Sequence, residues 1–541
     1  MDNEFRLFGP PGTGKTTTLK SWIDQDARKN GSESILVASF TRTAAHEIAG
    51  RHLPLAREQV GTLHSHCYRA IGKPDVTAKH IDDWNAFAPA WKLGSTARQH
   101  NMDEPETDQS FDTPAEAIYS QYQILRARMT PRSDWPLQVT RFAQKWEDWK
   151  AAHHLVDFTD MIEIAYRDVE NPGYSIAYYD EAQDFNPLEL ALIRHWGESM
   201  DHYILAGDDD QCLYSWSGAS ADAFINPPLS PSQKRILTQS YRVPRSIQAY
   251  AQSWIEQLHH REPKLYRPRA DDGLLMPFAY THYDTERIVE AVEQHLGNGK
   301  TVMVLSTCSY MLKPLIDELR TCGIPFHNPY RRSRGDWNPL TPSTGISASE
   351  RLLAFLAMDT TLYGEDAHVW TGLDLKKWAD CLKADQVFRR GAKAQIEQLP
   401  FEQEVRFDWF AQWMHDEAFS HALDMDLDWF IDHALASKRG PLDFPYQIVK
   451  SRGAKALTET PKLTIGTIHS VKGGQADVVL LFPDISKAAM AEWQDHRSDG
   501  HDALIRAMYV GMTRARETLI LGHPLSSLAV ALPVLETSYA A

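Results

Sequence analysis

The sequence predicts an α/β fold in which parallel sheets are flanked by helices, and three observations lead to this prediction. Short apolar runs recur along the chain, and each is followed by a helical or loop segment, an alternation typical of a mostly parallel sheet. A glycine-rich loop follows the first of these runs and leads into a helical segment. The chain has 541 residues, a length that favours several hydrophobic cores over one. We therefore expect two α/β lobes.

The expected strands fall into two sets. The first set comprises the runs Glu4–Phe8, Ile35–Ser39, Ser175–Asp180 and His202–Asp208, and the second comprises Leu274–Tyr280, Thr301–Thr307, Lys462–His469, Asp477–Phe482 and Thr518–His523. Two helix-patterned stretches, about Lys73–Leu155 and about Leu340–Thr460, interrupt this alternation. We interpret both as inserted helical subdomains, in which tryptophans more often pack a small core than stack on a base.

Composition narrows the class of protein. No apolar run of about 18 residues occurs, and the charged start MDNEFR is unlike a signal peptide. Five cysteines lie far apart without a C-x-x-C pair, so we expect reduced, structural thiols. The net charge of −16 argues at face value against a nucleic-acid partner, although an acidic protein can still hold a strand in one basic groove. We expect a cytoplasmic protein, in a bacterial cell or a phage-infected host, without a membrane partner.

The glycine-rich loop is GPPGTGKT, which matches the phosphate-loop pattern G-x-x-x-x-G-K-[ST]. In this pattern glycines let backbone N–H groups turn toward phosphate oxygens, the lysine supplies positive charge and the last hydroxyl binds Mg²⁺. The expected nucleotide-binding residues are Gly9, Gly12, Thr13, Gly14, Lys15, Thr16 and Thr17. The cofactors are therefore expected to be ATP and Mg²⁺, but kinases, GTPases, transporters and nucleic-acid motors all use this loop.

Two later segments supply the groups that phosphoryl transfer to water requires. Asp180 and Glu181 end an apolar run and should lie at the carboxyl edge of the sheet, where α/β folds bind ligands. Asp180 is expected to hold Mg²⁺ and Glu181 to orient and deprotonate the attacking water. The next run ends in AGDDDQCLYSWSGA, in which Gln211 can sense a γ-phosphate and Trp216 can stack on a base.

These segments are part of an ordered series of motifs. The series is GPPGTGKT, Ser39–Arg51 (SFTRTAAHEIAGR), Val60–Arg69 (VGTLHSHCYR), Leu155–Met161 (LVDFTDM), Asp180–Asp184 (DEAQD), GDDDQCLYSWSGA, Gln239–Ile247 (QSYRVPRSI), Thr464–Phe482 (TIGTIHSVKGGQADVVLLF) and Ala507–Leu521 (AMYVGMTRARETLIL). In order and spacing it resembles the UvrD/Rep/PcrA-type helicases of superfamily 1A, over nearly the whole chain.

The resemblance implies two RecA-like lobes that bind MgATP between them. In the family, arginines of the second lobe contact the γ-phosphate, which here assigns Arg242 and Arg514, and Tyr241 corresponds to the tyrosine that stacks on adenine. Gln475 stands where the family usually has a glutamate for the ribose hydroxyl. The implied DNA contacts are Phe40, Thr41, His64, Trp216 and His469.

The resemblance also divides the chain into four parts. Residues 1–72 and 156–239 are expected to form the first lobe, residues 73–155 its helical insert, residues 240–339 and 461–541 the second lobe, and residues 340–460 the second insert. The chain begins only eight residues before Gly9, whereas family members carry an adenine-reading glutamine well upstream of the loop. We therefore expect a compact form, phage-encoded or from a mobile element, that lacks this motif and has relaxed nucleotide selectivity.

The expected function is that of an ATP-dependent 3′-to-5′ DNA helicase, whose partners are single-stranded DNA and single/double-strand junctions. The LYSWSGA continuation resembles the 3′-to-5′ group. One alternative is a single-strand translocase that removes proteins or serves a separate nuclease without processive unwinding. Another is a binding module whose ATPase has decayed, which the intact set of ATP-site residues disfavours. The sequence does not identify replication or repair proteins as partners.

Overall fold

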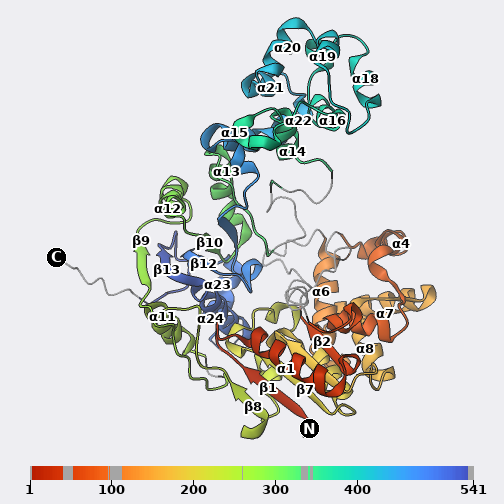
Figure 1. Cartoon of the computed structure of the whole chain (residues 1–541). Helices are drawn as coiled ribbons and strands as arrows, with labels where there is room; N and C mark the ends of the chain where they lie inside the picture. The colour runs from red at the N-terminus through yellow and green to blue at the C-terminus, as the bar shows by residue number, and fades with distance from the viewer. Residues whose placement is uncertain are drawn as a thin grey trace, which may run out of the picture. The chain divides into compact units, whose positions relative to one another are not determined.

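The computed structural model describes residues 3–40, 53–94, 97, 113–258, 260–330, 339–340, 345–496 and 498–533 (Figure 1). The chain forms two compact units. The first comprises Met1–Thr281, Leu305–Tyr310 and Thr467–Ala541, and the second comprises His282–Val304 and Met311–Gly466. The division into two lobes and two inserts stays a prediction.

A six-stranded parallel sheet organises the N-terminal part of the first unit. Its order is β3-β2-β6-β7-β1-β8. Its strands are β1 (Glu4–Phe8), β2 (Ile35–Ser39), β3 (Val60–Thr62), β6 (Ile176–Asp180), β7 (His202–Gly207) and β8 (Lys234–Ile236). The four longer strands lie where the apolar runs predicted them, which confirms the parallel α/β expectation. Since all strands are parallel, their carboxyl ends meet at one edge of the sheet.

Alternate residues of these strands enter two cores, one on each face of the sheet, as the two-residue period of a strand requires. Along β2, Ile35 and Val37 belong to one core, whereas Leu36 and Ala38 belong to the other. Helix α1 (Lys15–Asn30) covers the first face. Helices α3 (Leu63–Ala70), α8 (Phe158–Asp168) and α9 (Pro187–Gly197) contribute buried side chains to the opposite core. Burial on both faces explains why the strands read as continuous apolar runs.

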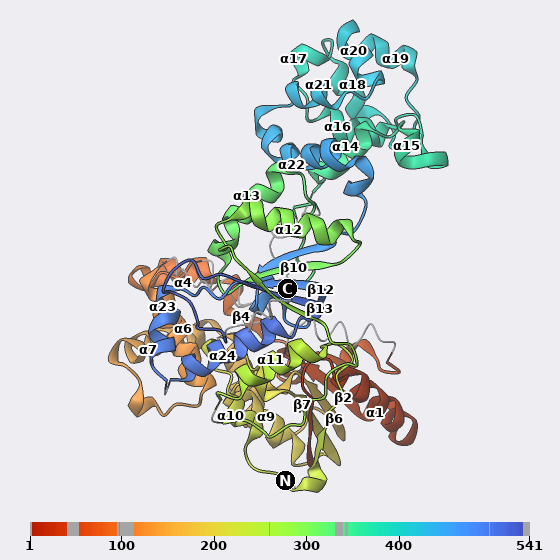
Figure 2. The same ribbon diagram turned by 90° about the vertical axis from the view of Figure 1, so that its left-hand side faces the viewer.

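Strands of the second predicted set also form at the expected places. In the first unit β12 (Ala476–Leu481), β13 (Ala515–Gly522) and β9 (Leu274–Phe278) pair in parallel, in that order. Helices α11 (Arg245–Ile255) and α24 (Asp499–Met512) pack side by side next to them (Figure 2). The indole N–H of Trp254 donates to the Ile505 carbonyl across this helix pair, at 2.8 Å. The remaining two strands, β10 (Val302–Ser306) and β11 (Leu463–Thr467), match the predicted runs as well.

The first predicted insert is helical and has a tryptophan core. Its elements are β4 (Asp75–Val76), α4 (Ile81–Phe87), α6 (Pro114–Ala127), α7 (Leu137–His153) and β5 (Leu155–Val156). Trp84, Trp135, Trp146 and Trp149 are buried in one cluster, with Trp91 packed against it. The ring centroids of Trp84 and Trp146 lie 4.8 Å apart, edge to face. The packing interpretation of these tryptophans is therefore confirmed.

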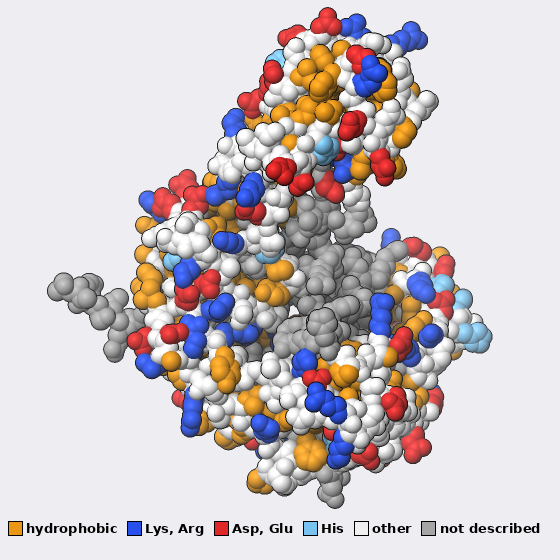
Figure 3. Space-filling view, in the orientation of Figure 1, with side chains coloured by type: hydrophobic (Ala, Val, Ile, Leu, Met, Phe, Trp, Pro, Cys, Tyr) orange, Lys and Arg blue, Asp and Glu red, His pale blue; other side chains and the backbone are white. Residues whose placement is uncertain are grey.

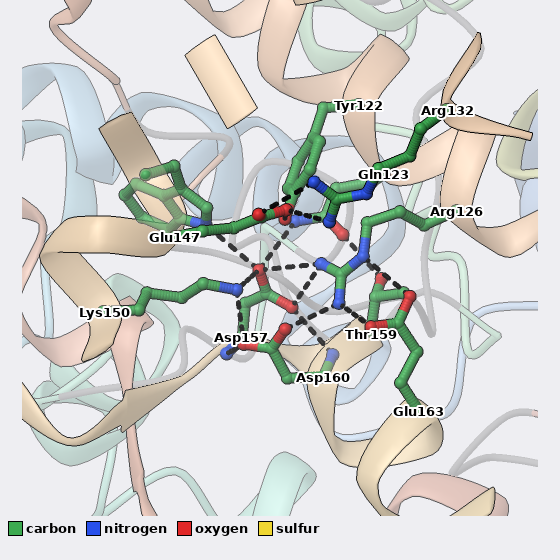
Figure 4. A network of polar contacts seen from close by, with 11 residues as sticks. Tyr122, Gln123, Arg126, Arg132, Glu147, Lys150, Asp157, Thr159, Asp160 and Glu163 are labelled. Atoms are coloured by element: carbon green, nitrogen blue, oxygen red, sulfur yellow. Dashed lines mark hydrogen bonds and ion pairs between the residues drawn. The ribbon is translucent and has the colours of Figure 1, made fainter. Parts of the chain in front are cut away.

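A buried ion network ties α6 and α7 to α8 (Figure 4). Arg126 lies at its centre and donates to both oxygens of Asp157, each at 3.1 Å, and to Asp160 at 2.6 Å. Lys150 of α7 donates to Asp157 from the other side, at 2.7 Å. The Asp157 side chain is 0% exposed and that of Arg126 is 4% exposed. Burial raises the pKa of Asp157, but the two cations outweigh this effect and hold it well below the usual value.

Replacing Arg126 with methionine should destabilise the first unit by about 3–5 kcal/mol, because it leaves buried carboxylates without their main counter-charge. The change is measured as the free energy of unfolding by chemical denaturation, followed by tryptophan fluorescence. The matched control is Arg132→Met, since Arg132 is 64% exposed and pairs with Glu147 at the surface. That variant should lose about 1 kcal/mol or less; equal losses for both variants would refute the argument.

Most of the remaining α-helices lie in the second unit, whereas α10 (Ala221–Ile225) and α23 (Lys487–Gln494) belong to the first. Helices α12 (Thr285–Gly297) and α13 (Lys313–Thr321) pack together, and α13 contacts α22 (Ala436–Arg452). The second predicted insert also contains α14 (Ala348–Phe355), α15 (Thr360–Tyr363), α16 (Gly372–Ala379), α17 (Ala384–Val387), α18 (Ala392–Gln398), α19 (Phe407–Trp413), α20 (Asp416–Leu423) and α21 (Leu427–Asp432). Trp370, Trp378 and Trp429 are buried here, and Trp409 and Trp413 are half-buried. The helical expectation for this stretch is confirmed.

Acidic and basic side chains are interspersed over the face drawn in Figure 3, and neither sign forms a single block among the side chains coloured there. All five cysteines are free thiols. Within the described residues, no helix combines the length and the apolar character needed to cross a membrane.

Candidate functional site

The phosphate loop connects the carboxyl end of β1 to α1. The Gly9 N–H donates to the Gly207 carbonyl at 3.2 Å, which fixes the start of the loop to β7. Lys15 Nζ donates to the Gly9 carbonyl at 2.7 Å, so its side chain reaches back across the loop. Gly14 is left-handed, with φ 83°, and caps α1 without a side-chain hydrogen bond. A helix N-terminus of this kind attracts phosphate, because its N–H groups and its dipole both favour an anion.

The segment that carries Tyr241 and Arg242 lies directly on this loop. The Tyr241 N–H donates to the Gly12 carbonyl at 2.8 Å, and the Ser240 hydroxyl donates to the Pro11 carbonyl at 2.9 Å. A Cβ atom on Gly12 would lie 2.4 Å from the Cβ of Arg242, and Gly12 has φ +75°. Only glycine fits this position, for both reasons. Tyr241 is 74% exposed.

Asp180 accepts a hydrogen bond from the last hydroxyl of the phosphate loop, that of Thr16. Thr16 Oγ1 donates to Asp180 Oδ2 at 3.1 Å. Burial and the neighbouring Glu181 raise the pKa of Asp180 to about 7, against the influence of Lys15. A buried carboxylate of this kind gains from a cation, and Mg²⁺ prefers hard oxygen ligands. The donor set of Thr16 and Asp180 therefore fits Mg²⁺.

Glu181 is held as a carboxylate beside Asp180. Its backbone is left-handed, with φ +54°, and the Gln183 amide donates to Glu181 Oε2 at 2.6 Å. Burial raises the pKa of Glu181, but Lys472, at 3.6 Å, and Lys15 outweigh it and lower the pKa to about 2. The residue is thus ionised and oriented, which is the state in which it can accept a hydrogen bond from water.

Gln211 and Arg514 are in direct contact. Arg514 Nη2 donates to Gln211 Oε1 at 2.9 Å, and Gln211 Nε2 donates to Asp208 Oδ2 at 2.6 Å. Arg514 is 1% exposed. Burial and the neighbouring Arg242 lower its pKa to about 9. Arg242 Nε in turn donates to Gln475 Oε1 at 2.9 Å. The predicted catalytic residues of the early and late motifs therefore converge around the phosphate loop.

Three of the expected DNA contacts surround one tyrosine, Tyr214. Phe40, Trp216 and His469 gather around Tyr214, with ring centroids 5.0, 6.2 and 6.4 Å from its ring. Phe40 is only 7% exposed and stacks on Tyr214, so this structure places it in the core rather than at the surface. His64 Nδ1 lies 3.6 Å from Glu189 Oε1. Thr41, together with most of the motif Ser39–Arg51, lies outside the described residues.

Two ring nitrogens in the Tyr214 group are buried without a hydrogen-bond partner among the described residues, namely Trp216 Nε1 and His469 Nδ1. Burial lowers the pKa of His469 to about 4, so the ring is neutral near pH 7. Buried polar groups without partners are uncommon in native proteins.

Sequence reasoning missed several ionic partners of the site. Lys472 donates to Asp184 and, at 3.1 Å, to the Gln211 carbonyl, and its cation lies 5.2 Å from the Tyr214 ring centroid. Lys264 and Arg261 pair with the consecutive aspartates Asp208, Asp209 and Asp210. Three aspartates at the end of a buried strand require counter-charges, but the sequence does not say which distant cations supply them.

Comparison with known proteins yields one family and several relatives. Residues 2–227 match the UvrD/REP helicase N-terminal domain. The chain is 25% identical over 297 residues to a probable DNA helicase II homolog of Mycoplasma capricolum, covering 49% of this chain and 40% of that protein. It is 24% identical over 338 residues to the ATP-dependent DNA helicase PcrA of Staphylococcus epidermidis, covering 54% of this chain and 44% of that protein. The chain thus spans less than half the length of these two relatives.

Proposed function

We propose that the chain is an ATP-dependent 3′-to-5′ DNA helicase, because residues 2–227 match the UvrD/REP helicase N-terminal domain and its motifs resemble those of UvrD/PcrA-like superfamily 1 helicases. It would translocate on single-stranded DNA and unwind duplex by hydrolysing MgATP. Single-stranded DNA and single/double-strand junctions would be its partners. The names of the relatives support a DNA helicase. The polarity rests on the resemblance of the LYSWSGA segment to the 3′-to-5′ group.

The single observation that carries the proposal is the contact between Gln211 and Arg514 beside the phosphate loop. Gln211 belongs to the predicted first lobe and Arg514 to the predicted second lobe, and their side chains are 2.9 Å apart. A γ-phosphate held by Lys15 would give this pair a common anionic partner. Binding and release of that phosphate would therefore alter the contacts of the Gln211 segment, which also carries Trp216, an expected strand contact.

Each side chain of the site has a defined task in the proposed reaction. Thr16 and Asp180 would hold Mg²⁺, which supplies charge neutralisation at the phosphates when bound. Lys15 would pair with phosphate oxygens, and Glu181 would accept a hydrogen bond and then a proton from the attacking water. Arg242 and Arg514 would stabilise the charge that develops in the transition state.

Strand displacement tests the proposal. Duplexes with a 3′ overhang, a 5′ overhang or blunt ends are mixed with the protein and MgATP, and release of the labelled strand is followed. We expect release from the 3′-overhang substrate in preference to the other two. Displacement from the 5′ overhang alone would overturn the polarity. DNA-stimulated hydrolysis without displacement would favour the alternative, a single-strand translocase that removes proteins or serves a separate nuclease.

Trp216→Ala should weaken single-strand binding by about 1–3 kcal/mol, since base stacking on an aromatic ring contributes about that much. The dissociation constant for a labelled oligonucleotide measures the effect by fluorescence anisotropy. Trp22→Ala is the control, because Trp22 packs against the core on the face of the sheet covered by α1. Lower thermal stability of Trp216→Ala with unchanged affinity would show that the indole serves the core instead.

A further inference from the structure

Residues 261–267 contact both the phosphate loop and the segment that carries Gln211, although they lie outside every motif of the resemblance. The Tyr266 hydroxyl donates to the Pro11 carbonyl at 3.1 Å. Lys264 Nζ lies 3.0 Å from Asp208 Oδ1 and 3.0 Å from Asp210 Oδ2, and it also donates to Asp209. This short segment therefore reaches two parts of the proposed ATP site at once.

Lys264 is a buried cation among buried carboxylates. Its side chain is 1% exposed, and Asp208, Asp209 and Asp210 are 0%, 0% and 1% exposed. Burial lowers the pKa of Lys264, but the three carboxylates outweigh burial and raise it above the usual value. Arg261 adds a second cation, 2.5 Å from Asp210. An unpaired buried charge destabilises a folded protein. The Lys264 ammonium therefore offsets the cost of burying the Asp208 carboxylate.

Asp208 and Arg514 together hold the Gln211 amide in one orientation. The amide has one accepting oxygen and one donating nitrogen, and its two partners leave no choice between them. Asp208, as a carboxylate, can only accept, so it faces Gln211 Nε2 at 2.6 Å. Arg514 can only donate, so it faces Gln211 Oε1 at 2.9 Å. Without a carboxylate at position 208 the amide would lose the acceptor that holds Nε2 and would keep only its Arg514 contact, so its position against the guanidinium would be less fixed.

We propose that Lys264 is a positioning residue for ATP hydrolysis: through the Asp208 carboxylate it fixes the Gln211 amide so that Oε1 faces Arg514. The inference rests on the proposed ATPase function and adds to it a residue of no assigned role. Lys264 does not contact the phosphate loop itself. Its loss should therefore lower kcat while leaving the KM for ATP within about threefold, because small displacements of a reacting group can cost about 10²-fold in rate.

A double-mutant cycle tests the proposal. Lys264→Met keeps most of the side chain and removes the charge, and we expect DNA-stimulated kcat to fall about 10²-fold. In a Gln211→Ala background the same change should cost less than about threefold, because residues that act as a unit are not additive. Lys264→Arg, which retains the cation, should recover most of the activity. An equal loss from Lys264→Met in both backgrounds would overturn the proposal.

A nearby ion pair provides the control. Lys234 Nζ lies 2.9 Å from the Glu262 carboxylate, so it pairs with the same segment without contacting the aspartates. Lys234→Met should leave kcat within about twofold of wild type.

If Lys264→Met does not fold, as judged by circular dichroism, the double-mutant cycle is run with Asp208→Asn in its place. The same non-additivity with Gln211→Ala is expected, and additive effects would overturn the proposal. A wild-type protein without DNA-stimulated hydrolysis would refute the proposed function itself, whereas additive mutants of an active protein refute only the role of Lys264.

Discussion

Replacement of Lys15 with alanine is expected to abolish ATP hydrolysis while single-stranded DNA still binds. Lys15 Nζ reaches back to the Gly9 carbonyl at 2.7 Å, and it is the cation that the phosphate loop itself supplies. Removing a preorganised donor from a reacting phosphate should cost at least about 10²–10³-fold in kcat. The rate is measured as phosphate release at saturating oligonucleotide, and DNA affinity is measured separately by anisotropy.

Lys20→Ala is the control for Lys15→Ala. Lys20 lies on the same helix, α1, and pairs with Asp24 at 2.8 Å with both side chains partly exposed. An exposed pair of this kind contributes about 0–1 kcal/mol to stability, so the control should hydrolyse ATP at the wild-type rate. If Lys15→Ala retained turnover, the phosphate loop would not be the site of hydrolysis.

Arg514→Ala should lower kcat by about 10³–10⁵-fold, the range observed for arginine fingers in phosphoryl transfer. The guanidinium uses three nitrogens here: Nη2 on Gln211 Oε1, Nε on the Val510 carbonyl at 3.0 Å and Nη1 on the Gly474 carbonyl at 3.3 Å. A lysine has one nitrogen and cannot reproduce this fork. Arg514→Lys should therefore be nearly as slow as Arg514→Ala in the same steady-state assay.

Arg516→Ala separates this effect from a general loss of positive charge. Arg516 lies two residues away, is 46% exposed and approaches Asp477 only to 3.8 Å. It should retain the wild-type kcat. Wild-type turnover by Arg514→Lys would show that Arg514 acts only as a diffuse charge and would remove its proposed role in the transition state.

Much of the fold follows from local pattern. The four longer strands of the first sheet were predictable because burial on both faces makes them continuous apolar runs. Strands β3 and β8 have three residues each and carry no such signal, since half-buried edge strands are short and mixed in composition. The tryptophan cores of both inserts were predictable because large aromatic side chains usually pack when helices surround them.

The residues of the candidate site were predictable where a sequence motif is specific to one kind of chemistry. Residues outside such motifs were harder to predict. The pattern around Lys15 specifies a phosphate loop, and the structure brings the predicted Asp180, Gln211 and Arg514 to it. The burial of Phe40 against Tyr214 was not predictable, because it depends on tertiary packing. The contacts of Lys264 were not predictable either, because nothing in the sequence that follows α11 indicates that this lysine pairs with the buried aspartates.

The most direct test of the account is steady-state ATP hydrolysis by the wild-type protein, with Mg²⁺, in the presence and absence of a single-stranded oligonucleotide. The account predicts slow hydrolysis by the protein alone and stimulation of at least about 10-fold by the oligonucleotide, because the segment of Gln211, proposed to sense the γ-phosphate, also carries Trp216, proposed to contact the strand. Hydrolysis that is absent, or that does not respond to DNA, would contradict it.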